Sequence, residues 1–405
     1  MSQTEPAPRR VAILGSTGSI GRQTRAVIEH CNALAGAQRF EIVGLCAGSD
    51  ADALFDQADA LGVRELALGD DQSPIDDTGR NLRRGECAAR RLIEDTQPDL
   101  VVGAIVGIAG LDSTLYAASR GIDIALANKE SLVAGGQLVM DAARKSGARI
   151  LPLDSEHAGV WQCLLAILGR DYTPPAPIDD SIARITLTAS GGAFRDWSRD
   201  DILRATPTDA LNHPNWSMGA KVTIDCASLM NKGLELIEAH WLFDIPADKL
   251  DAIIHPQSIV HAFVECTDGS TIAQLGAPDM RCPIQHALCF PDRNARKGDR
   301  LDLQTLSGLD FEPVDHDRFP AVRMALDTIK AGGTAGAILN AANEIAVDAF
   351  LNEQIRFGQM TDIVRETINA VRVEPTATLP AVLAADASAR DHAKGLIGTR
   401  AGGVR

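Results

Sequence analysis

The organisation of this chain is set by the stretch Val11-Ala-Ile-Leu-Gly15-Ser-Thr-Gly18-Ser-Ile-Gly21 near its N-terminus. The four apolar residues predict a buried strand, and a helical pattern begins directly after the glycines. In this setting glycines permit a tight turn and a close approach of the backbone to a pyrophosphate, which then faces the N–H groups of the helix N-terminus. The spacing is GxxGxxG rather than GxGxxG, so a glycine-rich turn that serves only helix–sheet packing stays open as the alternative.

Apolar runs of strand length alternate with helical segments as far as residue 153. Strands that are buried on both faces read as nearly continuous apolar runs, and a helix between successive strands makes them parallel. We therefore predict an α/β fold whose first domain, residues 1–153, is a Rossmann-like doubly wound parallel sheet. The predicted strands are 11–15, 40–46, 65–68, 99–106, 122–127 and 149–153.

The pattern changes after residue 153. An apolar helix at 157–169 is followed by a proline-rich break and then by runs of strand character. The turn signal Thr267-Asp-Gly-Ser270 predicts a hairpin and antiparallel pairing, so we predict a central α+β catalytic domain at 154–290. The strands predicted in it are 182–189, 221–225, 252–265 and 270–275.

The last part of the chain is rich in alanine and has the helical period. We predict a linker at 291–315 and a C-terminal α-helical bundle at 316–405, with a mobile tail after Gly395. Asn340 and Glu344 share a helix face there, and we expect them to support the site from outside.

Composition limits the class of protein. The chain has 405 residues, 45% hydrophobic and 23% charged, which is enough for two or three domains. A net charge of −15 repels polyanions, so nucleic acid and anionic membranes are poor partners and an anionic small molecule needs local cations. We find no apolar signal core and no apolar run of membrane-spanning length, and the eight cysteines are scattered. We therefore expect a cytoplasmic protein with reduced thiols.

Two polar triplets follow predicted strands directly. Asn128-Lys129-Glu130 comes after strand 122–127, and Asp154-Ser155-Glu156 comes after strand 149–153. Because ligands of such sheets bind outside the carboxyl ends of the strands, both triplets should face the crevice of the glycine loop. A triplet of this kind is also a common helix-capping turn, which is the alternative.

A further polar face lies on the predicted helix 228–240, where Asn231, Lys232 and Glu235 are neighbours. Most Lys–Glu pairs of this spacing are exposed and have no chemical role, but this helix is otherwise apolar, so its polar face requires a polar partner. Asp154, Glu156 and Glu235 together would suit a hard divalent cation beside an oxygen-rich anionic substrate.

Two loops leave alternatives open. The loop His213-Pro-Asn-Trp216-Ser-Met-Gly219 is predicted with equal weight as a lid over substrate or as a surface turn. Gly48-Ser49-Asp50 has no basic residue for a ribose 2′-phosphate and has an acid that could accept a hydrogen bond from a ribose 2′-hydroxyl, whereas Arg22 could reach that region. These residues alone leave NADP and NAD equally open.

The chain resembles the 1-deoxy-D-xylulose-5-phosphate reductoisomerase family from about Arg10 to about Gly395. Several of the shared motifs are long and specific. They are GSTGSIG at 15–21, ANKESLV at 127–133, LPLDSEH at 151–157, SGGAFR at 190–195, HPNWSMGAKVTID at 213–225, LMNKGLELIEA at 229–239, HPQSIVH at 255–261 and NAANEIAV at 340–347.

The resemblance implies an NADP-dependent oxidoreductase of the non-mevalonate isoprenoid pathway. It would isomerise 1-deoxy-D-xylulose 5-phosphate and reduce it to 2-C-methyl-D-erythritol 4-phosphate. It also implies NADPH and one Mg²⁺ or Mn²⁺ per subunit, with Co²⁺ as a further candidate metal, in a homodimer.

The resemblance also assigns roles residue by residue. The metal ligands would be Asp154, Glu156 and Glu235, which with Lys129 make up the catalytic set. Substrate would be bound by Lys129, Ser155, Glu156, Ser190, His213, Trp216, Cys226, Asn231, Lys232 and Glu235. NADPH would be bound by Thr17, Gly18, Ser19, Ile20, Gly48, Asn128, Glu130 and Gly219.

Two positions depart from the family pattern. Asp50 stands in a loop that often carries a basic residue in relatives, which puts cofactor selectivity in question. Cys226 stands where relatives usually place a serine that hydrogen-bonds the substrate phosphate, and a thiol is the weaker donor. We expect a modest penalty in substrate affinity.

Two other functions remain as alternatives. One is an oxidoreductase of the homoserine or semialdehyde dehydrogenase kind, which does not need the three carboxylates. The other is a nucleotide sensor without catalysis, in which three converging acids with no cation would repel one another.

Overall fold

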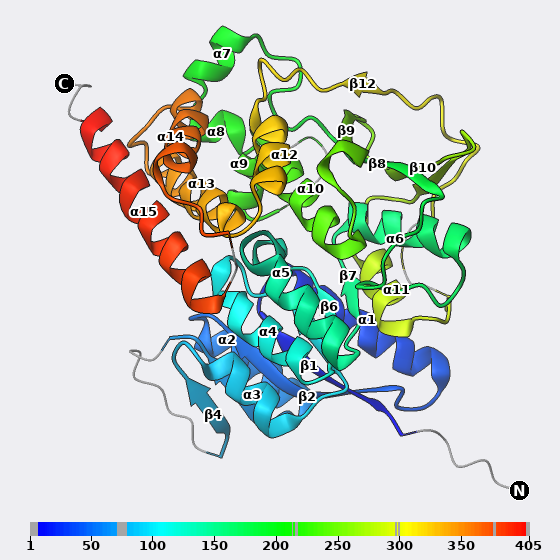
Figure 1. The fold of residues 1–405 in the computed structure, drawn as a ribbon. Helices are drawn as coiled ribbons and strands as arrows, with labels where there is room; N and C mark the ends of the chain where they lie inside the picture. Colours follow the sequence, from blue (N-terminus) through cyan, green and yellow to red (C-terminus); the bar gives the residue numbers. More distant parts are fainter. Residues whose placement is uncertain are drawn as a thin grey trace, which may run out of the picture.

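The structure, a computed structural model of the chain, describes residues 7–70, 79–212, 214, 218–295, 298, 300–375 and 378–401 (Figure 1). Its first sheet has seven strands in the order β4-β3-β2-β1-β5-β6-β7, and all neighbouring pairs are parallel. The chain therefore winds outward in both directions from β1, and a crevice forms at the carboxyl end of β1. The strands are β1 Arg9–Leu14, β2 Phe40–Ala47, β3 Glu65–Leu68, β4 Asn81–Arg84, β5 Leu100–Gly103, β6 Asp123–Leu126 and β7 Ile150–Pro152.

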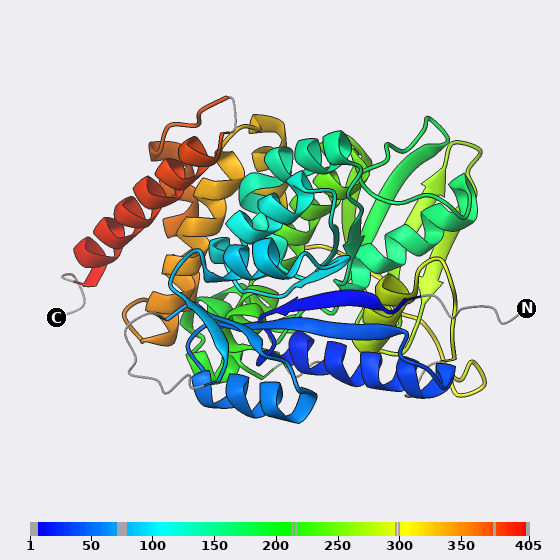
Figure 2. The ribbon, with the colours of Figure 1, turned by 90° about the horizontal axis from the view of Figure 1, so that it is seen from below.

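Helices pack along this sheet, as the views in Figures 1 and 2 show. They are α1 Ser19–Ala35, α2 Ala51–Leu61, α3 Ala88–Thr96, η1 Ile108–Gly110, α4 Leu111–Ser119 and α5 Lys129–Ser146. The doubly wound parallel sheet predicted from the sequence is confirmed. Strand β4 was not predicted, because three of its four residues, Asn-Leu-Arg-Arg, are polar and none of the four is fully buried at the edge of the sheet.

The first glycines are required by close backbone contacts. Gly15 has φ +83°, and a Cβ there would lie 2.3 Å from the carbonyl oxygen of Ala104, after β5. At Gly21 a Cβ would lie 2.5 Å from the carbonyl oxygen of Gly15. Backbone packing thus requires glycine at Gly15 and Gly21, while Gly18 has looser surroundings.

The second sheet has five strands in the order β11-β10-β8-β9-β12. Only β8 and β9 pair in parallel among these strands, and the β10–β11 hairpin over Thr267–Ser270 is confirmed. The strands are β8 Ile182–Ala189, β9 Leu250–Ile254, β10 Val260–Cys266, β11 Thr271–Leu275 and β12 Glu312–Pro313. The helices of this region are α6 Ser155–Leu168, α7 Arg199–Arg204, α8 Pro207–Ala210, α9 Ala220–Ala227, α10 Met230–Phe243, η2 Ala247–Lys249 and α11 Arg281–Cys289.

Two strand predictions in this region were wrong. Residues 221–225 are part of helix α9, although Val222, Thr223 and Ile224 favour strands, because side-chain packing overrides local propensity. The single strand expected at 252–265 is divided into β9 and β10, since Pro256 and the left-handed backbone of Ser258 (φ +52°) interrupt it.

The C-terminal region is helical, as predicted, and its helix α13 packs on α5 beside the parallel sheet. Gly336 of α13 makes this approach possible, because a Cβ there would lie 1.9 Å from the carbonyl oxygen of Val133. Helix α15 lies on the outside of the group and continues to Ala401, so the tail expected after Gly395 is helical to that residue. None of the described helices is long and apolar enough to cross a membrane. The helices are α12 Ala321–Ala331, α13 Ala335–Leu351, α14 Phe357–Ala370 and α15 Leu379–Ala401.

Candidate active site and metal centre

Both polar triplets lie at the carboxyl edge of the parallel sheet, and both start helices. Asn128 accepts a hydrogen bond from the backbone N–H of Ser131 (3.1 Å) at the start of α5, and Asp154 caps α6. The capping interpretation is therefore correct for the first residue of each triplet. The capped helix then holds the following residues, Lys129 and Glu156, at fixed positions beside the crevice.

Lys129 brings together carboxylates from two distant segments. Its Nζ lies 2.7 Å from Oδ2 of Asp154, 2.9 Å from Oε1 of Glu235 and 2.9 Å from Oδ1 of Asn231. Lys232 makes the second link, because its Nζ lies 3.0 Å from Oε1 of Glu156 and also pairs with Glu235. The polar face of α10 thus meets the two triplets, as its apolar surroundings predicted.

Burial and charge set the protonation of this cluster. Burial raises the pKa of Glu156 to about 7, and the neighbouring carboxylate of Glu235 adds to the rise. Burial opposes ionisation of Asp154 as well, but the charge of Lys129 outweighs it and holds the pKa of Asp154 well below its usual range. The pKa of Lys129 is raised in turn by Asp154 and Glu235 against the effect of burial. The two neighbouring carboxylates therefore favour the charged form of Lys129.

The three carboxylates fit a hard divalent cation. One oxygen of each of Asp154, Glu156 and Glu235 can be chosen so that all three lie within 4.8 Å of one another. Three carboxylates face two ammonium groups, Lys129 and Lys232, so one negative charge is left over when all are ionised. Oxygen donors with surplus negative charge are what Mg²⁺ and Mn²⁺ prefer.

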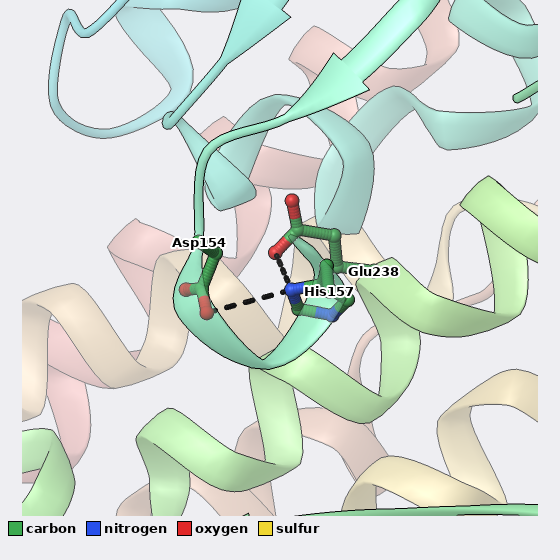
Figure 3. Close-up of side chains that lie close together, drawn as sticks. All are labelled: Asp154, His157 and Glu238. Atoms are coloured by element: carbon green, nitrogen blue, oxygen red, sulfur yellow. Dashed lines mark ion pairs between the residues drawn. The ribbon is translucent and has the colours of Figure 1, made fainter. Parts of the chain in front are cut away.

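His157 lies between the carboxylates of Asp154 and Glu238 (Figure 3). His157 donates from Nε2 to the backbone carbonyl of Glu235 (2.8 Å), while its Nδ1 lies 3.5 Å from Asp154 and 3.4 Å from Glu238. Burial lowers the pKa of this ring, but the charge of Glu238 overcomes it and raises the pKa of His157 to about 9. His157 is fully buried, and these contacts hold its ring between α6 and α10.

The glycine loop presents an open helix N-terminus. Gly18 precedes α1, and no side chain among the described residues caps that helix. The free N–H groups of a helix start suit a phosphate. The carboxylate of Asp50, considered as a partner for a ribose hydroxyl, accepts from the backbone N–H of Ala53 (3.1 Å) and caps α2. Arg22 binds the carbonyl of Thr17 and so lies across the loop.

The proposed substrate residues after β8 lie against α9. Ser190 Oγ accepts from the backbone N–H of Gly192 (3.2 Å), and Gly192 has φ +65°. A Cβ on Gly192 would lie 2.3 Å from the carbonyl oxygen of Cys226, so the loop and the helix are in direct contact. His213 and Trp216 lie outside the described residues. The choice between lid and surface turn for 213–219 therefore stays open.

The sequence interpretation missed two polar residues beside the proposed cofactor site. Lys221 and Asp225, neither of which had been singled out, form a network with Glu130 and with Asn343 of α13. The signal was present as a Lys–Asp pair at i, i+4 spacing, but it has meaning only in a helix. The strand predicted at 221–225 concealed it.

Models of one protein family match successive parts of the chain. They are described as "1-deoxy-D-xylulose 5-phosphate reductoisomerase" at residues 11–136, "1-deoxy-D-xylulose 5-phosphate reductoisomerase C-terminal domain" at 150–243 and "DXP reductoisomerase C-terminal domain" at 275–392. The 1-deoxy-D-xylulose 5-phosphate reductoisomerase of Chlorobaculum tepidum is 45% identical over 396 residues, which cover 96% of this chain and 100% of that protein. The relative from Cupriavidus necator is also 45% identical, over 95% of this chain and 97% of its own length.

Solved structures agree with these matches. A crystal structure of DOX-P reductoisomerase in complex with NADPH, fosmidomycin and magnesium has a TM-score of 0.88 and 39% identity, covering 96% of this chain and 98% of its own. The 1-deoxy-D-xylulose 5-phosphate reductoisomerase of Zymomonas mobilis, in complex with NADPH, has a TM-score of 0.86 and 40% identity over 96% of this chain and 99% of its own. The glycine loop, the carboxylate cluster and 45% identity over nearly the whole length of both chains lead to one conclusion: this chain belongs to the 1-deoxy-D-xylulose 5-phosphate reductoisomerase family.

Proposed function

We propose that this chain isomerises 1-deoxy-D-xylulose 5-phosphate and reduces it with NADPH to 2-C-methyl-D-erythritol 4-phosphate, in a reaction that depends on Mg²⁺ or Mn²⁺. The observation that carries the proposal is the meeting of Lys129 with Asp154 and Glu235 at the carboxyl edge of the nucleotide-binding sheet. Family membership supports the same activity, and related structures contain NADPH, fosmidomycin and magnesium.

Asp154, Glu156 and Glu235 would hold the metal ion. When bound, the metal supplies Lewis-acid polarisation of substrate oxygens, and NADPH supplies the hydride. The protein contributes rigidity, since two of the ligands start α6 and the third is buried on α10. Fixed ligands avoid the cost of reorganising charges during the reaction.

Lys129 would act as an electrostatic catalyst. Its ammonium group is buried at the centre of the oxygen-rich cluster, where the neighbouring carboxylates favour its charged form. In a site of low polarity, a fixed cation stabilises negative charge that develops on a substrate oxygen. The hydroxyl of Ser155, which lies against Glu156, would orient a substrate hydroxyl.

The substrate phosphate would bind where α9, α10 and the loop after β8 meet. We assign Lys232 as its charge partner, because an overall acidic protein needs a local cation for an anionic group. The other proposed contacts are Ser190, Cys226, Asn231, His213 and Trp216. Closure of the 213–219 loop over this site would exclude water.

NADPH would bind along the glycine loop and across to α5. The uncapped start of α1 at Gly18 is suited to its pyrophosphate. Glu130 at the start of α5 would form the far side of this site. The remaining contacts in this proposal are Thr17, Ser19, Ile20, Gly48, Asn128 and Gly219.

Three organisational predictions accompany this function. We propose domains at 1–153, 154–290 and 316–405 joined by the linker 291–315, a homodimer, and a cytoplasmic location. The homodimer draws support from strand β11, which lies at the edge of its sheet with Ile272 exposed, because an open strand edge can pair with a second copy. Light scattering of the purified protein measures its oligomeric state, and cell fractionation tests its location.

The test is loss of NADPH absorbance on addition of 1-deoxy-D-xylulose 5-phosphate. It is run with Mg²⁺, with excess EDTA, and with EDTA followed by Mg²⁺. The matched variant is Asp154→Asn, which keeps a residue able to cap α6 but removes the charge. We expect turnover that disappears in EDTA, returns with Mg²⁺ and is lost in the variant. Turnover that survives EDTA would point to a metal-independent dehydrogenase, and NADPH binding without turnover in Mg²⁺ or Mn²⁺ would point to a sensor.

A further inference from the structure

A third lysine ammonium group, that of the partly buried Lys221, lies beside the proposed cofactor site and has no role in the function proposed so far. Lys221 Nζ donates to Oε1 of Glu130 over 2.9 Å and forms an ion pair with Oδ2 of Asp225, also at 2.9 Å. The two carboxylates are almost fully buried, with side-chain exposures of 7% and 1%. Charges removed from water to this extent need fixed partners, and here one lysine serves both.

The network continues on both sides through amide groups. Asn128 Nδ2 donates to Oε2 of Glu130 (3.0 Å) and to the carbonyl oxygen of Gly107 (3.1 Å), in the loop after β5. On the other side, Asn343 Nδ2 of α13 donates to Oδ1 of Asp225 (2.8 Å). A continuous chain of contacts therefore joins the nucleotide-binding sheet, the start of α9 and the C-terminal helices.

The position of Lys221 in the chain makes this link specific. Lys221 is the second residue of α9 and follows Gly219 by two positions, at the downstream end of the 213–219 loop. Glu130 is the second residue of α5, directly after Lys129, which belongs to the carboxylate cluster. One ion pair thus fastens the end of the loop to the helix start that carries the central lysine.

We propose that Lys221 is a positioning residue for the cofactor site: it holds the Glu130 carboxylate in place and fixes the start of α9 against α5. The inference rests on the proposed function, because it takes Glu130 as an NADPH contact. Without Lys221 the Glu130 side chain keeps Asn128 as its partner but loses the only cation bound to it among the described residues. A buried carboxylate in that state moves toward water or takes up a proton, and either change alters the surface offered to NADPH.

The experiment is a double-mutant cycle on NADPH binding to the full-length protein, measured by titration of nucleotide fluorescence. The variants are Lys221→Gln, Glu130→Gln and the double variant, each checked for folding by circular dichroism and thermal unfolding. Steady-state KM values for NADPH and for 1-deoxy-D-xylulose 5-phosphate are measured alongside. The control is Arg9→Met, because Arg9 pairs with Asp123 (2.7 Å) where β1 and β6 begin, at the opposite end of the sheet from the site.

We expect Lys221→Gln to raise the Kd for NADPH by about tenfold or more, as for loss of one partner of a buried charged hydrogen bond. The double variant should be no weaker than Glu130→Gln alone, because Lys221 acts through Glu130. The control should bind NADPH like the wild type. A Kd for Lys221→Gln within about threefold of the wild type, or additive effects in the double variant, would overturn the proposal.

Two further outcomes are separable. If Lys221→Gln does not fold, the cycle is run with Lys221→Met, which keeps an unbranched side chain but removes the ammonium group, and the same criteria hold. If the wild type itself binds no NADPH, the proposed function fails and this inference fails with it. If the wild type binds NADPH and a folded Lys221 variant binds it equally tightly, only this inference is refuted.

Discussion

Replacing Glu235 by glutamine should separate metal binding from stability. Glu235 is almost fully buried and shares both ammonium groups of the cluster. Removing one partner of a buried ion pair normally costs about 3–5 kcal/mol, because a charge is left uncompensated. Here each lysine keeps a carboxylate, with Lys129 at 2.7 Å from Asp154 and Lys232 at 3.0 Å from Glu156. In the variant two carboxylates face two ammonium groups, so the charges balance. We therefore expect the free energy of unfolding of the metal-free protein to fall by only about 1 kcal/mol or less.

Metal affinity, in contrast to stability, should fall strongly in the Glu235→Gln variant. The variant has two anionic ligands instead of three, and we expect the affinity for Mn²⁺ to fall about a hundredfold, which corresponds to about 3 kcal/mol. At a metal concentration about a hundred times the wild-type Kd, binding stabilises the wild type by about 2.7 kcal/mol and the variant by about 0.4 kcal/mol. For 405 residues the unfolding entropy is about 0.85 kcal/mol/K, so the Tm shifts by about 3 °C and less than 1 °C respectively.

The assay is thermal unfolding with and without Mn²⁺, together with calorimetric titration of the metal. Asp123→Asn is the matched control, because Asp123 pairs with Arg9 and Arg149 at the opposite end of the sheet from the site. That variant should lose stability without metal and keep the full metal-induced shift. The reasoning is refuted if Glu235→Gln keeps a shift of about 3 °C, or if its metal-free Tm falls as far as that of the control.

Three further changes have defined outcomes. Gly21→Ala should abolish NADPH binding or folding, because the new Cβ would lie 2.5 Å from backbone atoms of Gly15 and Ser16; a normal Kd in a fluorescence titration would contradict the glycine-loop packing. Cys226→Ser should lower the KM for 1-deoxy-D-xylulose 5-phosphate about fivefold, because a hydroxyl is a stronger donor than a thiol, and an unchanged or raised KM would disprove it. Burial and the nearby Arg293 lower the pKa of His286 to about 4, whereas the pKa of a histidine in the unfolded chain is near 6.5. Between these two values the unfolded chain binds more protons than the folded protein. The contribution of His286 to the free energy of unfolding therefore falls as the pH decreases from 6.5 toward 4. His286→Phe keeps an aromatic ring against Trp161. When the pH is lowered from about 7 to about 5, the free energy of unfolding measured in urea should fall by about 2 kcal/mol less in this variant than in the wild type. An equal fall in both proteins would exclude this role of His286.

The sequence alone was sufficient for the parallel sheet and for the edge at which the site lies. Apolar runs of strand length alternating with helices have one stable arrangement, and loops after parallel strands gather at one edge, so the order of strands along the chain already places Lys129 near Asp154. Prediction from the sequence failed where the hydrophobic pattern is weak or misleading. The polar edge strand Asn81–Arg84 has no apolar run, and the β-branched residues after Lys221 favoured a strand where packing imposes a helix.

Only the tertiary structure decided how the charged groups of the site are shared. The sequence predicted that the three carboxylates belong together, but not that Lys129 and Lys232 bridge them, that His157 ties Asp154 to the backbone of Glu235, or that Lys221 fastens α9 to α5. Such contacts depend on the packing of α10 against α5, where Gly136 allows Trp241 to approach: a Cβ on Gly136 would lie 2.3 Å from the Trp241 ring. Local sequence patterns report the backbone period and the burial of single elements, whereas the partners of a buried charge are fixed by the distances between elements that are far apart in the chain.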